Sequence, residues 1–185
     1  MTDVTTPGPL LLCIDLQPTF LDVMPDRARL VKRCSFAIEA AQALGLPVAF
    51  TEQVPQKLGS TEPALLALAN RPLQLAKTTF SALADHGIRD ALLQGQHADH
   101  LLICGLETPV CIYQTAIDAL RSDIPVTLLS DCLGARRADD AAVAIDALQR
   151  AGVNVLPSET VFYSMMGDAA HPAFRSFTKL VKSYA

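Results

Sequence analysis

The sequence has no apolar run approaching the about 18 residues that a membrane-spanning helix requires. Its first nine residues, MTDVTTPGP, contain neither the basic region nor the apolar stretch of a secretory leader. We therefore expect a cytoplasmic protein without a membrane partner.

Cysteines are too few and too irregularly spaced for a disulfide framework or a zinc site. The chain has five, an odd number, and no two of them form a CxxC pair. We therefore expect reduced thiols at every one of these positions, which are Cys13, Cys34, Cys104, Cys111 and Cys132.

Motifs for metals and nucleotides are also missing. The four histidines form no HxH, HExxH or Asp-x-His spacing, and we place His97 and His100 in a polar turn before the fourth strand. The glycine fingerprints GxGxxG and GxxxxGK(S/T) do not occur. We expect no metal site and no cofactor.

Positive charge is scarce as well. Lysine and arginine number 15 against 19 aspartates and glutamates, so the net charge is −4, and the basic residues are scattered along the chain. Nucleic-acid grooves combine a basic stripe with interleaved aromatic residues. Because neither is seen, we expect no nucleic-acid partner.

What is present is enough apolar material for a sizeable core. Half of the 185 residues are hydrophobic and 18% are charged, which suits one globular domain. We expect a single domain over residues 1–185, with a flexible N-terminus over residues 1–8.

Short apolar runs alternate with helical patterns along the chain. Because this order implies right-handed crossovers, it predicts a three-layer α/β fold, a doubly wound and mostly parallel sheet of order 3-2-1-4-5-6 with helices on both faces. The loop at 51–61 is rich in Pro, Gly and Ser and predicts little regular structure. Expected strands are at residues 9–15, 47–50, 73–77, 101–105, 125–129 and 153–156, and helices at 26–44, 65–69, 81–94, 111–120, 139–151, 159–166 and 172–182.

One thiol stands at the point where a predicted strand turns into a helix. The apolar run 101–105 is followed by a short polar turn, and Cys111 then opens a helix with apolar residues at helical spacing. Free backbone N–H groups at a helix start favour a thiolate and can hold an oxyanion. The alternative is that Cys111 is a buried, small apolar side chain, which is the commoner state of a free cysteine.

The predicted topology supplies partners for this thiol. Ligands of doubly wound sheets bind outside the strand C-termini where the strand order reverses, which here is between the strand ending at Asp15 and the strand before Cys111. Lys77 ends a third strand, and its side chain or loop would have to reach inward to the crevice to take part in the chemistry. The alternative interpretation is that Lys77 is a solvated surface lysine.

A second acid and thiol follow the fifth strand. Asp131 is either a site residue or an acceptor of hydrogen bonds from loop amides, and Cys132 is the nucleophile that competes with Cys111. Nothing after Cys132 predicts an immediate helix start, so Cys111 is favoured.

Three separated segments resemble the isochorismatase-like cysteine hydrolases, a family that includes nicotinamidases and N-carbamoylsarcosine amidohydrolases. They are CIDLQPTF, LAKTTFSAL and ICGLETPVCIYQTAIDAL, with VTLLSDCLGA after the fifth strand. Within the family the chain resembles the small isochorismatase domain-containing proteins, most of which lack an assigned substrate. The resemblance implies a catalytic triad of Asp15, Lys77 and Cys111.

The resemblance also implies an oxyanion hole made by the backbone N–H groups of Val110 and Cys111, with a cis peptide bond at Pro109–Val110 or, alternatively, at Thr108–Pro109. In one respect the chain departs from nicotinamidases. They bind a metal through an Asp-x-His motif after the second strand, where residues 51–53 here read Thr-Glu-Gln. Isochorismatases proper differ in another way, since they lack a cysteine at this turn.

These observations lead to one functional hypothesis and two rivals. The first is a cofactor-free cysteine hydrolase that attacks a small amide or carbamoyl compound and forms a thioester, with Gln17, Phe20 and Phe80 as pocket walls. The rivals are a weakly catalytic module that binds a small ligand or a protein, and a redox-sensing thiol protein. We also expect a homo-oligomer, a dimer or larger.

Overall fold

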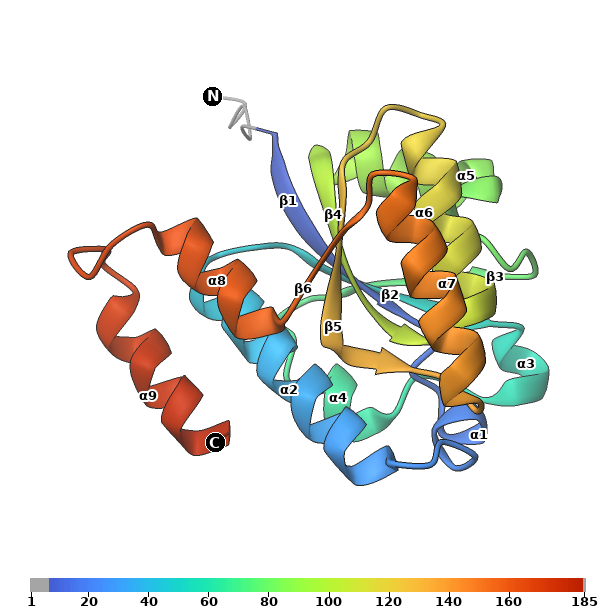
Figure 1. The fold of residues 1–185 in the computed structure, drawn as a ribbon, viewed down its shortest axis with the longest axis horizontal. Coiled ribbons are helices and arrows are strands. Elements are labelled where there is room, and N and C mark those ends of the chain that lie inside the picture. The colour runs from blue at the N-terminus through green and yellow to red at the C-terminus, as the bar shows by residue number, and fades with distance from the viewer. Residues whose placement is uncertain (1–6, 185) are drawn as a thin grey trace.

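Six parallel strands form the centre of the molecule, and a computed structural model describes residues 7–184 (Figure 1). The order is β3-β2-β1-β4-β5-β6, so the predicted doubly wound sheet is confirmed. The strands are β1 (Gly8–Ile14), β2 (Val48–Gln53), β3 (Leu73–Lys77), β4 (Ala98–Leu106), β5 (Val126–Gly134) and β6 (Asn154–Leu156).

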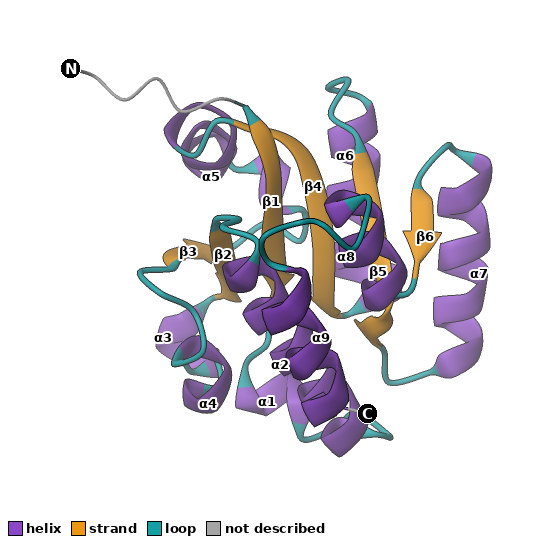
Figure 2. Ribbon diagram, turned by 90° about the vertical axis from the view of Figure 1, so that its left-hand side faces the viewer, coloured by secondary structure: helices purple, strands orange, loops and turns teal. Residues whose placement is uncertain are grey.

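Helices cover both faces of this sheet, which gives the three expected layers (Figure 2). Helices α2, α4, α8 and α9 lie on one face, and α5, α6 and α7 lie on the other. The bounds are α1 (Pro18–Leu21), α2 (Arg27–Ala43), α3 (Pro55–Leu58), α4 (Pro63–Leu66), α5 (His86–Asp90), α6 (Tyr113–Leu120), α7 (Ala138–Arg150), α8 (Ser158–Met166) and α9 (Phe174–Tyr184), with short helical turns η1 (Ala82–Ala84), η2 (Ala91–Gly95) and η3 (Thr108–Ile112).

Alternation along the central strands creates two separate cores. Leu11 and Cys13 of β1 face α2, whereas Leu10, Leu12 and Ile14 face the opposite layer. Because successive side chains of a strand point to opposite faces, an all-apolar strand is one that is buried on both sides. The run PLLLCI therefore predicts a central strand, and β1 is central.

Near the strand ends, at Gly105, the backbones of β4 and β1 leave no room for a side chain. A Cβ atom at this position would lie 2.1 Å from the carbonyl oxygen of Ile14, and Gly105 has a φ of 122°. Only glycine fits such a conformation next to another backbone. Gly105 thus lets β4 reach the end of β1, where the polar residues of the two strands meet.

Several strands run further than the sequence predicts. Pairing with β3 extends β2 through Gln53, so the predicted loop starts later and contains the short helix α3. Strand β4 begins at Ala98, which places His100 inside a strand and not in the preceding turn. Strand β5 continues past a register shift to Gly134, so Asp131 lies within it.

The helical predictions need two corrections, and the predicted N-terminus needs one. The helix expected at 81–94 is broken into η1, α5 and η2, with Asp85 capping α5. Helix α7 begins at Ala138 and not at Asp139, with Arg137 as its cap and Asp139 and Asp140 in its first turn. Of the N-terminus expected to be flexible, residues 1–6 lie outside the described part, and Gly8 already belongs to β1. No helix within residues 7–184 is long and apolar enough to cross a membrane.

Candidate active site

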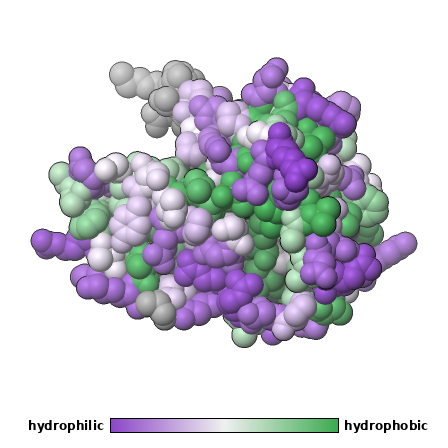
Figure 3. Space-filling model, viewed as in Figure 1, coloured by the Kyte–Doolittle hydropathy of each residue, from purple (hydrophilic) through white to green (hydrophobic). Residues whose placement is uncertain are grey.

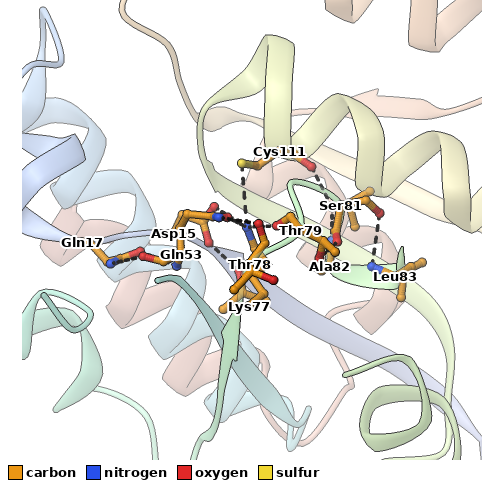
Figure 4. A network of polar contacts seen from close by, with 12 residues as sticks. Asp15, Gln17, Gln53, Lys77, Thr78, Thr79, Ser81, Ala82, Leu83 and Cys111 are labelled. Carbon is orange, nitrogen blue, oxygen red and sulfur yellow. Dashed lines mark hydrogen bonds and ion pairs between the residues drawn. The ribbon is translucent and has the colours of Figure 1, made fainter. Parts of the chain in front are cut away.

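Three side chains from different elements meet at the C-terminal edge of the sheet (Figure 4). Lys77 Nζ lies 2.7 Å from Asp15 Oδ2 and 3.8 Å from Cys111 Sγ. Asp15 follows β1, Lys77 ends β3, and Cys111 lies in the turn after β4. The strand order predicted from the sequence brings Asp15 and Cys111 together, and the length of the lysine side chain bridges the intervening strand β2.

Asp15 is held in a rare backbone conformation. Its φ is 53°, in the left-handed region that residues with a Cβ seldom adopt. Its N–H donates to the Thr51 carbonyl (3.0 Å), and its Oδ1 accepts from the Thr51 hydroxyl (2.9 Å). Such strained residues cluster at functional sites, where their surroundings enforce them.

The ammonium of Lys77 is surrounded by acceptors. It donates to Gln53 Oε1 (2.5 Å) and to the Thr79 carbonyl (3.3 Å) in addition to Asp15. Its side chain is fully buried, so the predicted alternative of a solvated surface lysine does not apply. A buried ion pair is stable only when further hydrogen bonds satisfy both partners, and here they do.

Cys111 does not open the regular helix, as the sequence predicts, but precedes it. It belongs to η3, and the regular helix α6 begins two residues later, at Tyr113. Its carbonyl accepts from the Thr115 hydroxyl (2.7 Å), whose oxygen in turn accepts from the Ala82 N–H (3.0 Å). Thr115 therefore ties the cysteine to the segment that follows Lys77.

The thiol is protonated at rest, contrary to the expected thiolate. Burial, and then the nearby negative charge of Asp15, raise the pKa of Cys111 to about 12, although Lys77 opposes this rise. Burial also raises the pKa of the Asp15 carboxyl, and Lys77, Cys111 and Thr51 offset it only in part. The site thus pairs a neutral thiol with a carboxylate that is a stronger base than usual.

The expected oxyanion hole is not preformed. The Val110 N–H donates to the Glu107 carbonyl (3.0 Å). Within residues 7–184 every peptide bond is trans, including Thr108–Pro109 and Pro109–Val110, so the expected cis bond is absent. The turn is closed by hydrogen bonds to Glu107, and this holds Val110 away from the role that the resemblance implies.

The predicted pocket residues have three different positions. Gln17 is fully buried, with its amide bonded to the backbone of Gln53 and Gly59. Phe20 packs, half-buried, against the core on the α2 face, while Cys111 belongs to the other core. Phe80 is 55% exposed. Of the three, Phe80 has the most exposed side chain.

Asp131 and Cys132 form part of the framework. Asp131 accepts from the N–H and hydroxyl of Ser158 (both 2.7 Å) and pairs with Arg33 (2.7 Å). Burial acts to raise the pKa of Asp131, but the bonds from Ser158 and Arg33 outweigh it and lower this pKa. Cys132 is fully buried on the α2 face. Asp131 thus joins α2, β5 and α8, as the loop-amide alternative predicts.

Residues 51–53, where the resemblance to nicotinamidases would place a metal motif, are engaged in other ways. Glu52 Oε1 accepts from the N–H (2.7 Å) and hydroxyl (2.9 Å) of Thr61, and so holds the following loop. No group of three or more candidate metal ligands occurs among the described residues. Thr51 and Gln53 belong to the site itself, although the sequence did not point to them.

These missed residues had one usable signal. Gln53 pairs in register with Lys77 across β2 and β3, so a longer predicted β2 would have placed the two at the same sheet edge. Thr115 had no comparable signal, because its role depends on the segment at 79–82 crossing over α6.

A cavity of about 360 Å³ adjoins the cysteine turn. Its charges are paired, since Arg136 bonds to Glu107 (2.8 Å) and Arg137 to Asp140. The cavity is lined by Glu107, Pro109, Val110, Arg136, Arg137 and Asp140.

Comparison with known proteins agrees with the fold and with the segments noted in the sequence. The isochorismatase domain model matches residues 9–160. The bovine isochorismatase domain-containing protein 2 is 35% identical over 94% of this chain and 82% of its own length.

Two solved structures extend the comparison. A structure described as MAR1 ribonuclease from Caenorhabditis elegans has a TM-score of 0.88 and 27% identity, covering 97% of this chain and 92% of the other. YcaC from Escherichia coli, described as an octameric hydrolase of unknown specificity, has a TM-score of 0.82 and 19% identity, covering 100% and 98%. At that identity YcaC supports the fold alone. On the domain match and the bovine relative together, this chain belongs to the isochorismatase family.

Proposed function

We propose that this protein is a cofactor-free cysteine hydrolase that cleaves a small amide or carbamoyl compound through a thioester. The observation that supports this most strongly is the contact of Lys77 Nζ with both Asp15 (2.7 Å) and Cys111 (3.8 Å) at the switch point of the sheet. A nucleophile, a proton acceptor and a cation in mutual contact are the parts that covalent acyl chemistry needs.

In the first step the Asp15 carboxylate accepts the thiol proton as Cys111 Sγ attacks the substrate carbonyl carbon. A resting thiol with a raised pKa suits this concerted transfer, because the proton leaves only when the carbon–sulfur bond forms. The raised pKa of Asp15 brings its basicity nearer to neutral pH, where a general base works best.

The protonated Asp15 then returns its proton to the leaving amine, and the carbon–nitrogen bond breaks to give a thioester. Water attacks the thioester with Asp15 again as the base, which releases the acid product and restores the thiol. Lys77 stays within reach of both charged atoms throughout, so it stabilises the negative charge as it moves from oxygen to sulfur.

For the oxyanion we propose the backbone N–H groups of Cys111 and Val110. For this the Val110 N–H has to exchange the Glu107 carbonyl for the substrate oxygen. A single donor of this kind lowers a barrier by about 3 kcal/mol in other enzymes.

The substrate is proposed to be small and neutral near the scissile bond. The charges of Asp15 and Lys77 cancel, and Cys111 is only 7% exposed. Phe80 is the proposed wall of the entrance, because it lies between Thr79, which contacts Lys77, and Ser81. An exposed aromatic ring beside a buried polar site offers an apolar surface for the rest of the substrate.

RNA cleavage, which the description of the C. elegans protein assigns to that protein, is a less favoured candidate. The cation of the proposed triad is Lys77, and its ammonium is buried against Asp15. A phosphodiester needs accessible positive charge along its backbone.

A direct test is to incubate the protein with a panel of small amides and carbamoyl compounds and to follow product and intact mass. We expect turnover of at least one compound and an acyl adduct on Cys111, both absent in Cys111→Ala. The matched control is Cys132→Ala, which removes a buried thiol and keeps turnover. Full turnover by Cys111→Ala, or RNA cleavage without any amide product, would refute the proposal.

We also propose that the chain forms a homo-oligomer. Large hydrophobic side chains are exposed on β6, α7 and α8, and Figure 3 shows hydrophobic residues gathered between α8 and α7. The exposed ones are Leu156 (41%), Val143 (71%), Tyr163 (36%) and Met165 (37%). Light scattering on the purified protein tests this, and a monomeric mass at micromolar concentration would contradict it.

A further inference from the structure

Gln53 is the residue whose contacts the proposed chemistry leaves unexplained. It is 8% exposed, its Oε1 accepts from Lys77 Nζ (2.5 Å), and its Nε2 donates to the Thr78 carbonyl (3.0 Å). Both the oxygen and the nitrogen of the Gln53 amide are therefore fixed by hydrogen bonds, and the partner of the oxygen is the Lys77 ammonium (Figure 4).

Whether the acceptor at position 53 is charged or neutral is important, because the same Lys77 ammonium also contacts Asp15 and Cys111. This ammonium is faced by the Asp15 carboxylate from β1, the Gln53 amide from β2, the Thr79 carbonyl after β3 and the Cys111 thiol from η3. The hydroxyl of Thr51, on β2, binds the carboxylate. Asp15 is thus the one anion among these contacts, and the negative charge passes from it to sulfur as the thiol loses its proton.

A neutral acceptor holds the ammonium without competing for its charge. We propose that Gln53 is a positioning residue, whose uncharged oxygen keeps Lys77 Nζ between Asp15 and Cys111 while the negative charge moves from carboxylate to sulfur. This inference rests on the proposed function and adds a residue to it. A carboxylate at this position would form a second ion pair with Lys77 and weaken its attraction for the sulfur.

The chain contains a matched control in Gln17. This residue is also buried and also binds the backbone around residue 53, accepting from the Gln53 N–H (2.7 Å) and donating to its carbonyl (3.1 Å). Its contacts are with the backbone of Gln53 and Gly59, and none of the hydrogen bonds described for it reaches Lys77. Loss of Gln17 therefore loosens the same segment without touching the ammonium.

The experiment measures the rate at which iodoacetamide alkylates Cys111, followed by peptide mass spectrometry from pH 6 to 10, so that no substrate is needed. For Gln53→Glu we expect the rate profile to move to higher pH by about one unit, which is about tenfold slower at a given pH. For Gln17→Met we expect the wild-type profile and a lower melting temperature.

A double-mutant cycle with Lys77→Met separates positioning from general packing. If Gln53 acts through Lys77, Gln53→Glu changes the rate by less than about twofold in the Lys77→Met background, since coupled residues are not additive. If Gln53→Glu does not fold, Gln53→Met is used in its place. We then expect the alkylation rate of Cys111 to fall about threefold when Lys77 is present and to stay unchanged in the Lys77→Met background.

Three results have distinct meanings. A Gln53→Glu profile identical to wild type, or an equal effect with and without Lys77, would overturn the role of Gln53. An equal shift in Gln17→Met would also overturn it, because the effect would then come from the loop. A wild-type Cys111 that iodoacetamide alkylates no faster than Cys132 would instead contradict the proposed function.

Discussion

The molecule holds its thiols in two contrasting environments on opposite faces of the sheet. Four of them meet between the sheet and α2, where Cys104 Sγ lies 3.5 Å from Cys13 Sγ and Cys34 Sγ lies 3.5 Å from the Cys132 carbonyl. All four are fully buried. Cys111 lies alone in the other core, in contact with Lys77 and the carboxylate of Asp15.

Acidity does not separate these two groups. The pKa is raised for Cys111 and for the four thiols of the α2 face alike, with burial the leading cause for Cys13, Cys132 and Cys111. The difference is the neighbour. Cys111 has a base whose pKa is raised and a cation that can hold the resulting charge. Of the buried thiols, Cys132 also contacts a carboxylate, Asp131 Oδ1 (3.7 Å), but that carboxylate is already engaged by Ser158 and Arg33 and its pKa is lowered. The proposed role of Cys111 as the nucleophile therefore depends on its partners and not on its acidity.

The largest expected effect comes from removing the base. Asp15→Asn should lower turnover by about 10³-fold, since general bases contribute roughly 10² to 10⁴. Its counterpart beside the other thiols is Asp131→Asn, which should keep turnover within about threefold and cost about 2 kcal/mol of stability by weakening the bonds to Ser158 and Arg33.

Steady-state kinetics and chemical denaturation measure both variants. If Asp131→Asn lowered turnover more than Asp15→Asn, the proposed assignment of Asp15 as the base and Asp131 as a structural residue would be wrong.

The pH dependence gives the next largest effect. Asp15 must be ionised to accept a proton, and its pKa lies above the ordinary value of 3.8, so kcat/KM should fall about tenfold per pH unit below that raised pKa. The contribution of Asp15 to the free energy of unfolding should change in the opposite direction, and fall as the pH rises. A raised folded pKa means that this group contributes most to stability below pH 3.8 and loses that contribution as pH rises through the folded pKa.

Asp15→Asn should remove both dependences, which pH-rate profiles and urea melts at several pH values can measure. An acid limb that lies at or below pH 3.8 would show that Lys77 dominates over burial.

The smallest effect on catalysis should come from the four buried thiols. Cys104→Ala removes one sulfur from close packing with Cys13, and we expect a loss of about 1 to 2 kcal/mol in unfolding free energy. Turnover and Cys111 alkylation should stay at wild-type levels. A large loss of activity in a variant that melts normally would show that the two faces are coupled through the sheet.

Much of this arrangement was predictable from the sequence, because apolar runs ending in Asp15 and Lys77 fix both a strand and the residue at its tip. The strand order then brings those tips together. The ends of β2 and β5 were missed, since polar residues such as Gln53 and Asp131 continue a strand only when a neighbouring strand supplies their hydrogen bonds.

The electrostatic state of the site was also beyond the sequence. The argument for a thiolate relied on the helix start, but burial depends on the whole fold and raises the pKa of Cys111 even against the charge of Lys77. The orientation of Val110 depends on where Glu107 places its carbonyl, which no local pattern encodes.

The ties made by Asp131 have a consequence for how the chain is completed as it is synthesised. Its partners, Arg33 and Ser158, lie about a hundred residues before it and some thirty after it, and α9 then packs Tyr184 onto Phe36 of α2. Chains emerge from the ribosome at roughly 5 to 20 residues per second. Until α8 emerges, Asp131 lacks its Ser158 partners, so we expect this side of the sheet to reach its final packing only after most of the chain has been synthesised.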